Sequence, residues 1–270
     1  MKLIIYFFIN SNIWVAFCIL GLIFSAEILL GTTNFKISQF VFCATILAYN
    51  FQRLVRLNKG QEHFYKDWLN NNRKLIFLLM FFAAIVSGYL FFDFKLSTQL
   101  AILFVGIISV FYPFLLRGIP FAKIFIISFV WAFSAMILLL LENNILISQN
   151  IFWKWLALFL FVFAITIPFD IRDIKYDKQN IVTIPLFFGV KAAKIIAVFA
   201  LFICGIICFF QYLEMTLSLP NLLALIMLYI LASIFIIKSD KRNTKIYFSF
   251  WVESLSLFSY FLLVISELIF

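Results

Sequence analysis

The chain has 270 residues, of which 66% are hydrophobic and 12% are charged, and its formal net charge is +9. So few charged side chains could not cover the apolar surface of a soluble domain of this length, and the composition therefore excludes an ordinary soluble fold. The basic excess could indicate nucleic-acid binding, but in a membrane protein it more often reflects topology.

Apolar runs long enough to cross a membrane recur along the chain. A helix of about 20 residues crosses roughly 30 Å of hydrocarbon, whereas these runs lack the polar–apolar alternation of barrel strands. The first residues resemble a signal peptide without a small-residue cleavage site, so we interpret them as an uncleaved lead-in. We predict an all-α polytopic membrane protein with nine transmembrane helices at 12–31, 35–57, 74–92, 97–116, 121–141, 149–169, 190–212, 219–237 and 246–269.

The basic residues divide the connections between these spans into two sides. Of the 21 Lys and Arg residues, only Lys36, Lys95 and Lys154 fall on one side. A wrong number of spans would mix the two sides, so the asymmetry favours nine crossings, with the N-terminus in the cytoplasm and the C-terminus outside. Topology and attraction to anionic lipids then explain the net charge, and no nucleic acid is needed. Without Pro-, Gly- or Ser-rich linkers, we expect a single domain over 1–270.

Three acidic residues follow the sixth predicted span at its cytoplasmic end. Asp170, Asp173 and Asp177 are spaced i, i+3 and i+7, which would place them on one helix face. Carboxylates on one face repel one another unless a cation lies between them, and oxygen ligands without His or Cys suit Mg²⁺. A solvated face neutralised by the interleaved basic residues is the alternative. The position at the mouth of an apolar helix favours a functional site.

The segment "DIRDIKYDKQNIVTIPLFFG" resembles the second signature of the UbiA superfamily of intramembrane aromatic prenyltransferases. That signature is D-x-x-D-x-x-x-D, a basic residue, a Thr-hydrophobic-Pro step and a Gly. Its positions here are Asp170, Asp173, Asp177, Lys178, Thr183, Pro185 and Gly189. The segment "YPFLLRGIPFAK" (112–123) is similar to the family's connection between helices four and five, in which Tyr112, Arg117 and Lys123 would lie near a diphosphate.

The resemblance implies a fold and a reaction. Nine helices would surround a central apolar cavity, and Mg²⁺ on the acidic motifs would bind the diphosphate of a polyprenyl donor. Metal and basic groups would take up the charge of the leaving diphosphate. The allylic carbocation would be shielded from water and stabilised by aromatic faces until an aromatic or lipid-like acceptor attacks it.

The family's first motif, N-x-x-x-D-x-x-x-D at the end of helix two, is incomplete in the segment "YNFQRLVRLN". Asn50 matches the leading Asn, but Leu54 and Asn58 stand at the two Asp positions, with Arg53 and Arg56 nearby. The arginines could grip the diphosphate directly, with one Mg²⁺ on the second motif. Alternatively, the site could bind an anionic isoprenoid without ionising it, or the arginines could reflect topology alone.

The resemblance, together with the two arginines that depart from its first motif, gives a set of predicted site residues. The predicted catalytic residues and metal ligands are Asp170, Asp173 and Asp177, with Asn50 as a further metal ligand. The predicted diphosphate-binding residues are Arg53, Arg56, Arg117, Lys123, Lys178 and Tyr112.

A few polar residues lie outside the motifs. Glu253 falls about 10 Å from the inner end of the last span, at 1.5 Å per residue, and could face the chamber, as could Asn12. His63 lies in a polar loop that could cap the mouth. Cys204 and Cys208 are one helical turn apart, but we interpret them as small apolar residues of the bundle rather than metal ligands.

Two other function classes compete with the membrane prenyltransferase. One is a non-catalytic isoprenoid-binding or scaffold protein of the same fold. The other is a transporter, which we disfavour because there is no pair of Gly/Pro-interrupted half-helices and no inverted repeat. The expected partners are a polyprenyl diphosphate donor, an apolar or aromatic acceptor and the lipid bilayer. A composition rich in Phe, Ile and Asn suggests an AT-rich bacterial genome, and hence the bacterial inner membrane.

Overall fold

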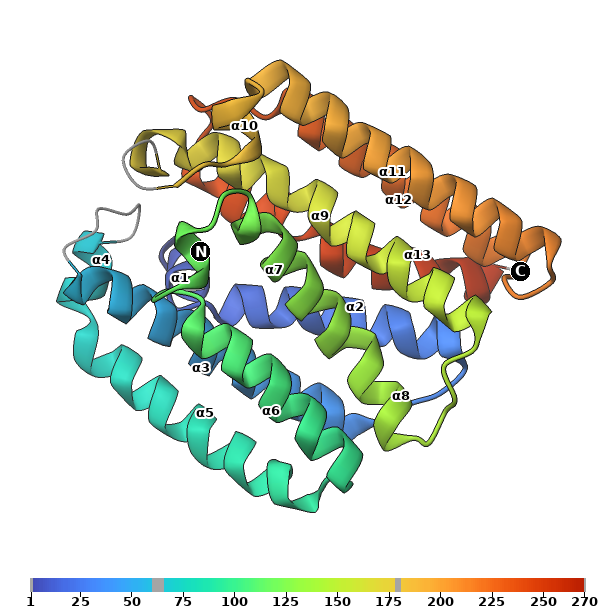
Figure 1. The fold of residues 1–270 in the computed structure, drawn as a ribbon, viewed down its shortest axis with the longest axis horizontal. Coiled ribbons are helices and arrows are strands. Elements are labelled where there is room, and N and C mark those ends of the chain that lie inside the picture. The colour runs from blue at the N-terminus through green and yellow to red at the C-terminus, as the bar shows by residue number, and fades with distance from the viewer. Residues whose placement is uncertain (1, 60–65, 178–180, 270) are drawn as a thin grey trace.

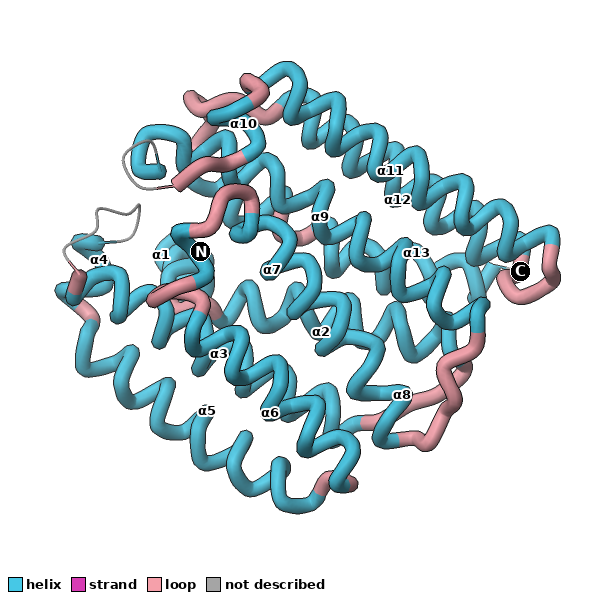
Figure 2. The backbone as a smooth tube through the Cα atoms, viewed as in Figure 1, coloured by secondary structure: helices cyan, strands magenta, loops and turns pink. Residues whose placement is uncertain are grey.

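The computed structural model describes residues 2–59, 66–177 and 181–269, and over these residues it is built of helices without strands (Figure 2). This confirms the predicted all-helical class. Seven long helices are uninterrupted: α2 (Ile13–Leu30), α3 (Phe35–Asn58), α5 (Arg73–Asp93), α6 (Leu96–Phe111), α9 (Gln149–Asp177), α11 (Val190–Leu213) and α12 (Leu219–Lys238).

Two further long helices contain a wider π-helical turn. The first joins α7 (Ala122–Ala132) to α8 (Leu138–Glu142) through η2 (Phe133–Ile137), and the second joins η3 (Tyr247–Val252) to α13 (Leu255–Ile269). Single π turns within α-helices often mark functional sites. The remaining helices are short: α1 (Lys2–Asn10), α4 (Lys66–Asn71), the 3₁₀ turn η1 (Leu116–Gly118) and α10 (Ile184–Phe187).

Seven helices of the described residues are long and apolar enough to cross a membrane, namely α2, α5, α7 with α8, α9, α11, α12 and η3 with α13. Of the other two predicted spans, α6 is shorter at 16 residues, and α3 bears Arg53 and Arg56 near its end. The protein is therefore an integral membrane protein, and the number of nine crossings stays a prediction for α3 and α6.

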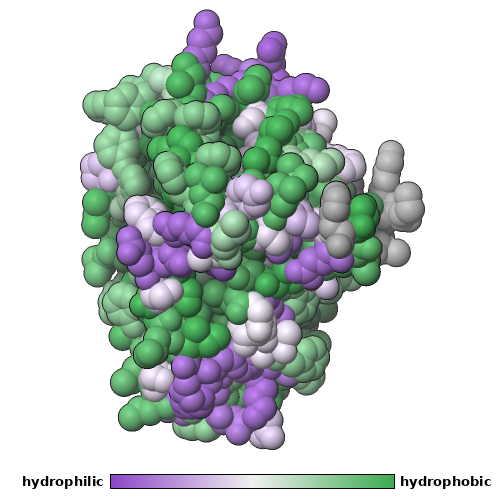
Figure 3. All heavy atoms as spheres, turned by 90° about the vertical axis from the view of Figure 1, so that its right-hand side faces the viewer, coloured by the Kyte–Doolittle hydropathy of each residue, from purple (hydrophilic) through white to green (hydrophobic). Residues whose placement is uncertain are grey.

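The helices lie roughly along a common direction, from α5 and α6 on one side to α11 and α12 on the other (Figure 1). The short helices α1, α4 and α10 gather at the end of the bundle that holds the N-terminus, and the C-terminus lies at the opposite end. Figure 3 views this opposite end, where polar groups form separate patches among apolar side chains.

Close backbone contact ties α2 to α13 within the bundle. A Cβ atom on Gly21 would stand 2.7 Å from the Leu257 Cα atom, so only glycine permits this approach. One turn later, the hydroxyls of Ser25 and Ser259 share a hydrogen bond of 2.7 Å. Small and hydroxyl-bearing residues are typical of helix contacts in membranes, where apolar burial gives little net attraction between helices.

Candidate active site

A cavity of about 180 Å³ lies at the N-terminal end of the bundle, and five basic residues contribute to its lining. Two of them, Arg53 and Arg56, come from the end of α3. The others are Arg117 of η1, Lys123 of α7 and Arg172 of α9. Among the described residues of the lining, the carboxylates are Asp173 and Glu253. The cavity therefore has the electrostatic character of an anion site.

The ammonium group of Lys123 lies among all three aspartates of α9. Its Nζ atom is 2.7 Å from an oxygen of Asp170, 2.9 Å from Asp177 and 3.8 Å from Asp173. The carboxylates of Asp170 and Asp177 are almost completely buried, so these ion pairs are shielded from water.

Two arginines complete the pairing of the acids. Arg117 donates a hydrogen bond to Asp177 at 3.0 Å, and Arg172 donates two hydrogen bonds to Asp173, at 2.7 and 2.9 Å. The guanidinium of Arg172 also lies over the rings of Phe169 and Phe248, at 5.1 and 5.9 Å from their centroids. Such forked and stacked contacts fix the orientation of an arginine side chain.

The turns around the site explain the rest of the second signature. Thr183 stands at the N-cap of α10 and Pro185 lies in its first turn, where the missing N–H of proline costs no helical hydrogen bond. Gly189 precedes α11 with a φ of +85°, a conformation that favours glycine. The backbone N–H of Phe121 donates to the carbonyl of Val182 at 2.9 Å and so ties the start of α7 to this segment.

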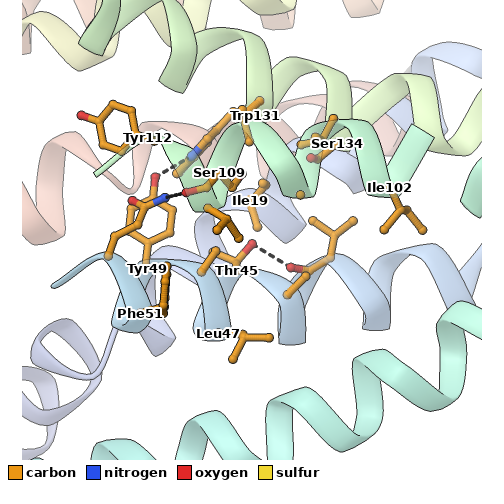
Figure 4. Close-up of a pocket in the computed structure, with 18 of the residues that line it drawn as sticks. Ile19, Thr45, Leu47, Tyr49, Phe51, Ile102, Ser109, Tyr112, Trp131 and Ser134 are labelled. Carbon is orange, nitrogen blue, oxygen red and sulfur yellow. Dashed lines mark hydrogen bonds between the residues drawn. The ribbon is translucent and has the colours of Figure 1, made fainter. Parts of the chain in front are cut away.

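A second, apolar cavity of about 400 Å³ continues from the cationic cavity between α3, α6 and α7 (Figure 4). The residues common to both linings are Tyr49, Gln52, Tyr112, Ile127 and Trp131. At this junction the indole N–H of Trp131 donates to the Tyr49 hydroxyl at 2.6 Å. The amide of Gln52 donates to the carbonyl of Ser109 at 3.0 Å, so the polar groups of the junction are partly satisfied by one another. Together the two cavities form a charged compartment joined to an apolar one.

The structure brings most of the predicted site residues together. Asp173 and the predicted basic residues Arg53, Arg56, Arg117 and Lys123 line the cationic cavity, as does Tyr112. Asp170 and Asp177 lie behind Lys123. Lys178 and His63 lie outside the described residues.

Asn50 is absent from the cavity lining, and its side chain is bonded elsewhere. Its amide donates to the carbonyls of Ser11 and Ile46 at 2.9 and 2.8 Å, and its oxygen accepts from Asn12 at 2.8 Å. Leu54, one turn later, packs in a small apolar cluster with residues of α1, α4 and α5. The cavity face of α3 instead carries Tyr49, Gln52, Arg53 and Arg56.

Several cavity residues lay outside the predicted set. Arg172 is one of the basic residues interleaved with the acids, and its bidentate pairing with Asp173 depends on side-chain geometry that sequence spacing does not show. Tyr49 and Trp131 gave no motif signal, because aromatic residues are abundant throughout this chain. Glu253, whose place in the chamber was an open possibility, does line the cavity, directly after the π turn of η3.

Lys245 adds a titratable charge at the edge of this region. It lies just before the last predicted span and is half-buried. Burial, together with repulsion from Arg53 and Arg172, lowers the pKa of its ammonium group to about 8.

The acids suit Mg²⁺ in chemistry, because their donor set consists of oxygen atoms. Both oxygens of Asp170 are buried without a hydrogen-bond partner among the described residues, although Lys123 forms an ion pair with one of them. In the described part of the chain, however, no three His, Cys, Asp or Glu side chains stand close enough to form a metal centre by themselves. Asp173, which faces the cavity, fits an ion that would take its other ligands from phosphate and water.

Comparisons with known proteins agree with this geometry. A sequence model of the UbiA prenyltransferase family matches residues 69–255, which is more than half of the chain. The chain therefore belongs to the UbiA prenyltransferase family, and prenyltransferase is the enzyme class that this membership assigns. No sequence among curated proteins matches the chain.

Solved structures share the fold at low sequence identity. An apo UbiA homologue from Aeropyrum pernix K1 matches with a TM-score of 0.71 and 12% identity, over 94% of this chain and 98% of that one. A homologue from Archaeoglobus fulgidus bound to GPP and Mg²⁺ matches with a TM-score of 0.70 and 13% identity, over 96% and 98%. A structure of digeranylgeranylglyceryl phosphate synthase matches with a TM-score of 0.58 and 13% identity, over 100% and 98%.

Proposed function

We propose that this protein transfers a polyprenyl group from its diphosphate to an aromatic or lipid-like acceptor inside the membrane, with the help of Mg²⁺. The observation that carries the proposal is the junction of a cationic cavity of about 180 Å³ with an apolar cavity of about 400 Å³. A prenyl diphosphate likewise has two parts, a charged diphosphate head and an apolar isoprenoid tail. The homologue from A. fulgidus solved with GPP and Mg²⁺ supports the choice of ligand.

The basic residues of the cavity would hold the diphosphate and make it a better leaving group. As the bond between the prenyl carbon and the diphosphate oxygen breaks, the electron pair leaves with the oxygen, and the negative charge grows on the phosphate. Arg53, Arg56 and Lys123 would stabilise that charge through hydrogen bonds in a site shielded from water. Bound Mg²⁺ would supply further Lewis-acid stabilisation of the same oxygens, with Asp173, which lines the cavity, as the candidate carboxylate ligand.

The allylic cation left behind would sit at the junction of the cavities. The aromatic rings of Tyr49, Tyr112 and Trp131 line this junction and would stabilise the positive charge through their faces. The acceptor then supplies the electron pair for the new bond and releases a proton. Among the described residues of the cationic cavity, Asp173 and Glu253 are the carboxylates that could receive it.

The proposal also includes the orientation of the protein in the membrane and its organisation as a single domain. The end of the bundle that carries the cationic cavity would face the cytoplasm of a bacterial cell, in line with the distribution of Lys and Arg along the sequence. The helices that line the cavities run from α1 to the last helix, which supports one domain over 1–270.

Diphosphate release tests the proposal. The purified protein in lipid nanodiscs is supplied with Mg²⁺ and a labelled polyprenyl diphosphate. We expect release by the unchanged protein and its loss in Asp173→Asn, because that variant removes the carboxylate of the acid cluster that lines the cavity. Asp240→Asn is the matched control, since Asp240 is exposed and pairs only with neighbouring Arg242 among the described residues.

Binding without release would favour the scaffold alternative. If the unchanged protein binds the polyprenyl diphosphate tightly but leaves it intact, and Mg²⁺ makes no difference, the protein holds isoprenoids without converting them. If diphosphate is released, the acceptor is to be sought among ring compounds and glycerol-based lipids, the second class being suggested by the digeranylgeranylglyceryl phosphate synthase structure of the same fold.

A further inference from the structure

The position of Lys123 within the acid cluster is unusual for a metal site. Its ammonium nitrogen lies 2.7 Å from Asp170 and 2.9 Å from Asp177, and it thus contacts both carboxylates, as an ion bridging the acids would. The pairing leaves the aspartates without excess charge, because Lys123, Arg117 and Arg172 balance Asp170, Asp173 and Asp177. A divalent ion between these carboxylates would have to displace a cation that the protein already holds there.

The lining of the cavity separates Lys123 from two of its partners. Lys123 itself faces the cavity, as does Asp173, whereas Asp170 and Asp177 are absent from the described lining. An ammonium group has three N–H donors. Two can serve Asp170 and Asp177, and the 3.8 Å distance to Asp173 is too long for a hydrogen bond. The third donor therefore remains available to an anion in the cavity.

Arg56 gives a second, independent sign that the cavity is built for an anion. Its Nε atom is buried and has no hydrogen-bond partner among the described residues, and the side chain lines the cavity. A buried charged donor without an acceptor is costly, which favours a phosphate oxygen as the missing partner.

We propose that Lys123 is a tethered cation that takes the place of a metal ion between Asp170 and Asp177. On this proposal, which rests on the proposed function, the protein binds the diphosphate head with Lys123, Arg53 and Arg56 and without any divalent ion. Asp170 and Asp177 are positioning residues that hold Lys123 at the cavity wall. Mg²⁺ joins only once the diphosphate is present, at Asp173.

Binding of geranyl thiolodiphosphate tests this assignment, because sulfur in place of the bridging oxygen prevents ionisation and isolates the binding step. The protein in nanodiscs is titrated by calorimetry, once in EDTA and once in Mg²⁺. We expect the two dissociation constants to agree within about tenfold, since protein cations supply most of the affinity.

Three outcomes of this titration are distinct. Binding in both buffers supports the tethered cation. Binding only in Mg²⁺ overturns it and leaves the proposed function intact. No binding in either buffer contradicts the proposed function and, with it, the role of Lys123.

Variants of the cluster sharpen the test. Lys123→Met should lose about 100-fold in affinity in EDTA, and Lys123→Arg should recover part of it. The gain in affinity caused by Mg²⁺ should vanish in Asp173→Asn but persist in Asp170→Asn, because only Asp173 would bind the ion.

Metal binding in the absence of diphosphate gives a readout that does not depend on activity. With Mn²⁺ alone, followed by electron paramagnetic resonance, we expect no bound ion in the unchanged protein and one bound ion in Lys123→Met, in which the ammonium group no longer contacts Asp170 and Asp177. Because a gained site requires a folded protein, this result cannot come from misfolding. Tight Mn²⁺ binding to the unchanged protein would overturn the proposal.

Discussion

The two joined cavities are held together in different ways. The cationic cavity depends on a few buried ion pairs, in which each aspartate of α9 has at least one basic partner within 3.0 Å. The apolar cavity depends on many interchangeable contacts, and the polar side-chain groups in its described lining are hydroxyls, one amide and one indole N–H. A single change should therefore disturb the first strongly, whereas the second should respond to changes of volume rather than of chemistry.

The largest effect is expected where one buried carboxylate pairs with two basic residues. Asp177→Asn removes the carboxylate that pairs with both Arg117 and Lys123, and breaking such a buried pair typically costs about 3–5 kcal/mol. We expect a strong fall in the melting temperature of the protein in nanodiscs or detergent. Asp240→Asn, at an exposed ion pair, is the control and should leave it unchanged. Equal melting temperatures would show that the pairing does not stabilise the fold.

A smaller effect is expected from Arg56, which lines the cationic cavity and forms no ion pair with the described acids. Arg56→Ala should weaken the binding of geranyl thiolodiphosphate by about tenfold to 100-fold, the usual range for one charged hydrogen bond. The comparison variant is Arg242→Ala, whose side chain is 85% exposed. An Arg56 variant that binds like the unchanged protein would remove this residue from the diphosphate site.

A substitution that fills the apolar cavity should change which lengths of prenyl donor the protein can use. A Cβ atom at Gly106, which lines that cavity, meets nothing within 4 Å, so Gly106→Leu can fill space without a backbone clash. We expect turnover of long polyprenyl diphosphates to fall while short donors are still used, measured as a profile of rate against chain length. Gly88→Leu is the matched control, because a Cβ atom at Gly88 also meets nothing within 4 Å and Gly88 is not part of the cavity lining. The same profile in both variants would contradict the assignment of the tail site.

The smallest expected effect is the change in diphosphate affinity with pH. Lys245 has a pKa of about 8, so it is mostly charged at pH 7 and becomes neutral as the pH rises through 8. The arginines stay charged over this range, so the affinity for the diphosphate should fall only about two- to threefold between pH 7 and pH 9. In Lys245→Met the dependence should be flatter. A fall of the same size in that variant would assign the titration to another group.

The fold followed from the sequence because bilayer-length apolar runs leave few alternatives to helices. The predicted span 12–31 corresponds closely to Ile13–Leu30 of α2. The span 149–169 ended too early, because hydropathy stops at the first charges whereas the helix of α9 continues to Asp177. That extra length is what carries the three aspartates on one helix.

The site could be predicted from the sequence only where a motif indicated which face of the helix carries each residue. The spacing of the aspartates indicated their common face, and the cluster did assemble around a cation, although the cation is Lys123. At the end of α3 the motif was incomplete, so matching Asn50 to it did not reveal that its amide is satisfied by Ser11, Ile46 and Asn12. The rotation of a helix about its axis depends on packing with its neighbours, which one sequence does not display.

The most direct measurement is a structure of the protein in nanodiscs with geranyl thiolodiphosphate. Our account predicts density for the two phosphates beside Arg53, Arg56 and Lys123. It also predicts density for the prenyl chain that passes between Tyr49 and Tyr112 into the apolar cavity. Phosphates seen elsewhere, or a chain that leaves toward lipid without entering that cavity, would contradict it.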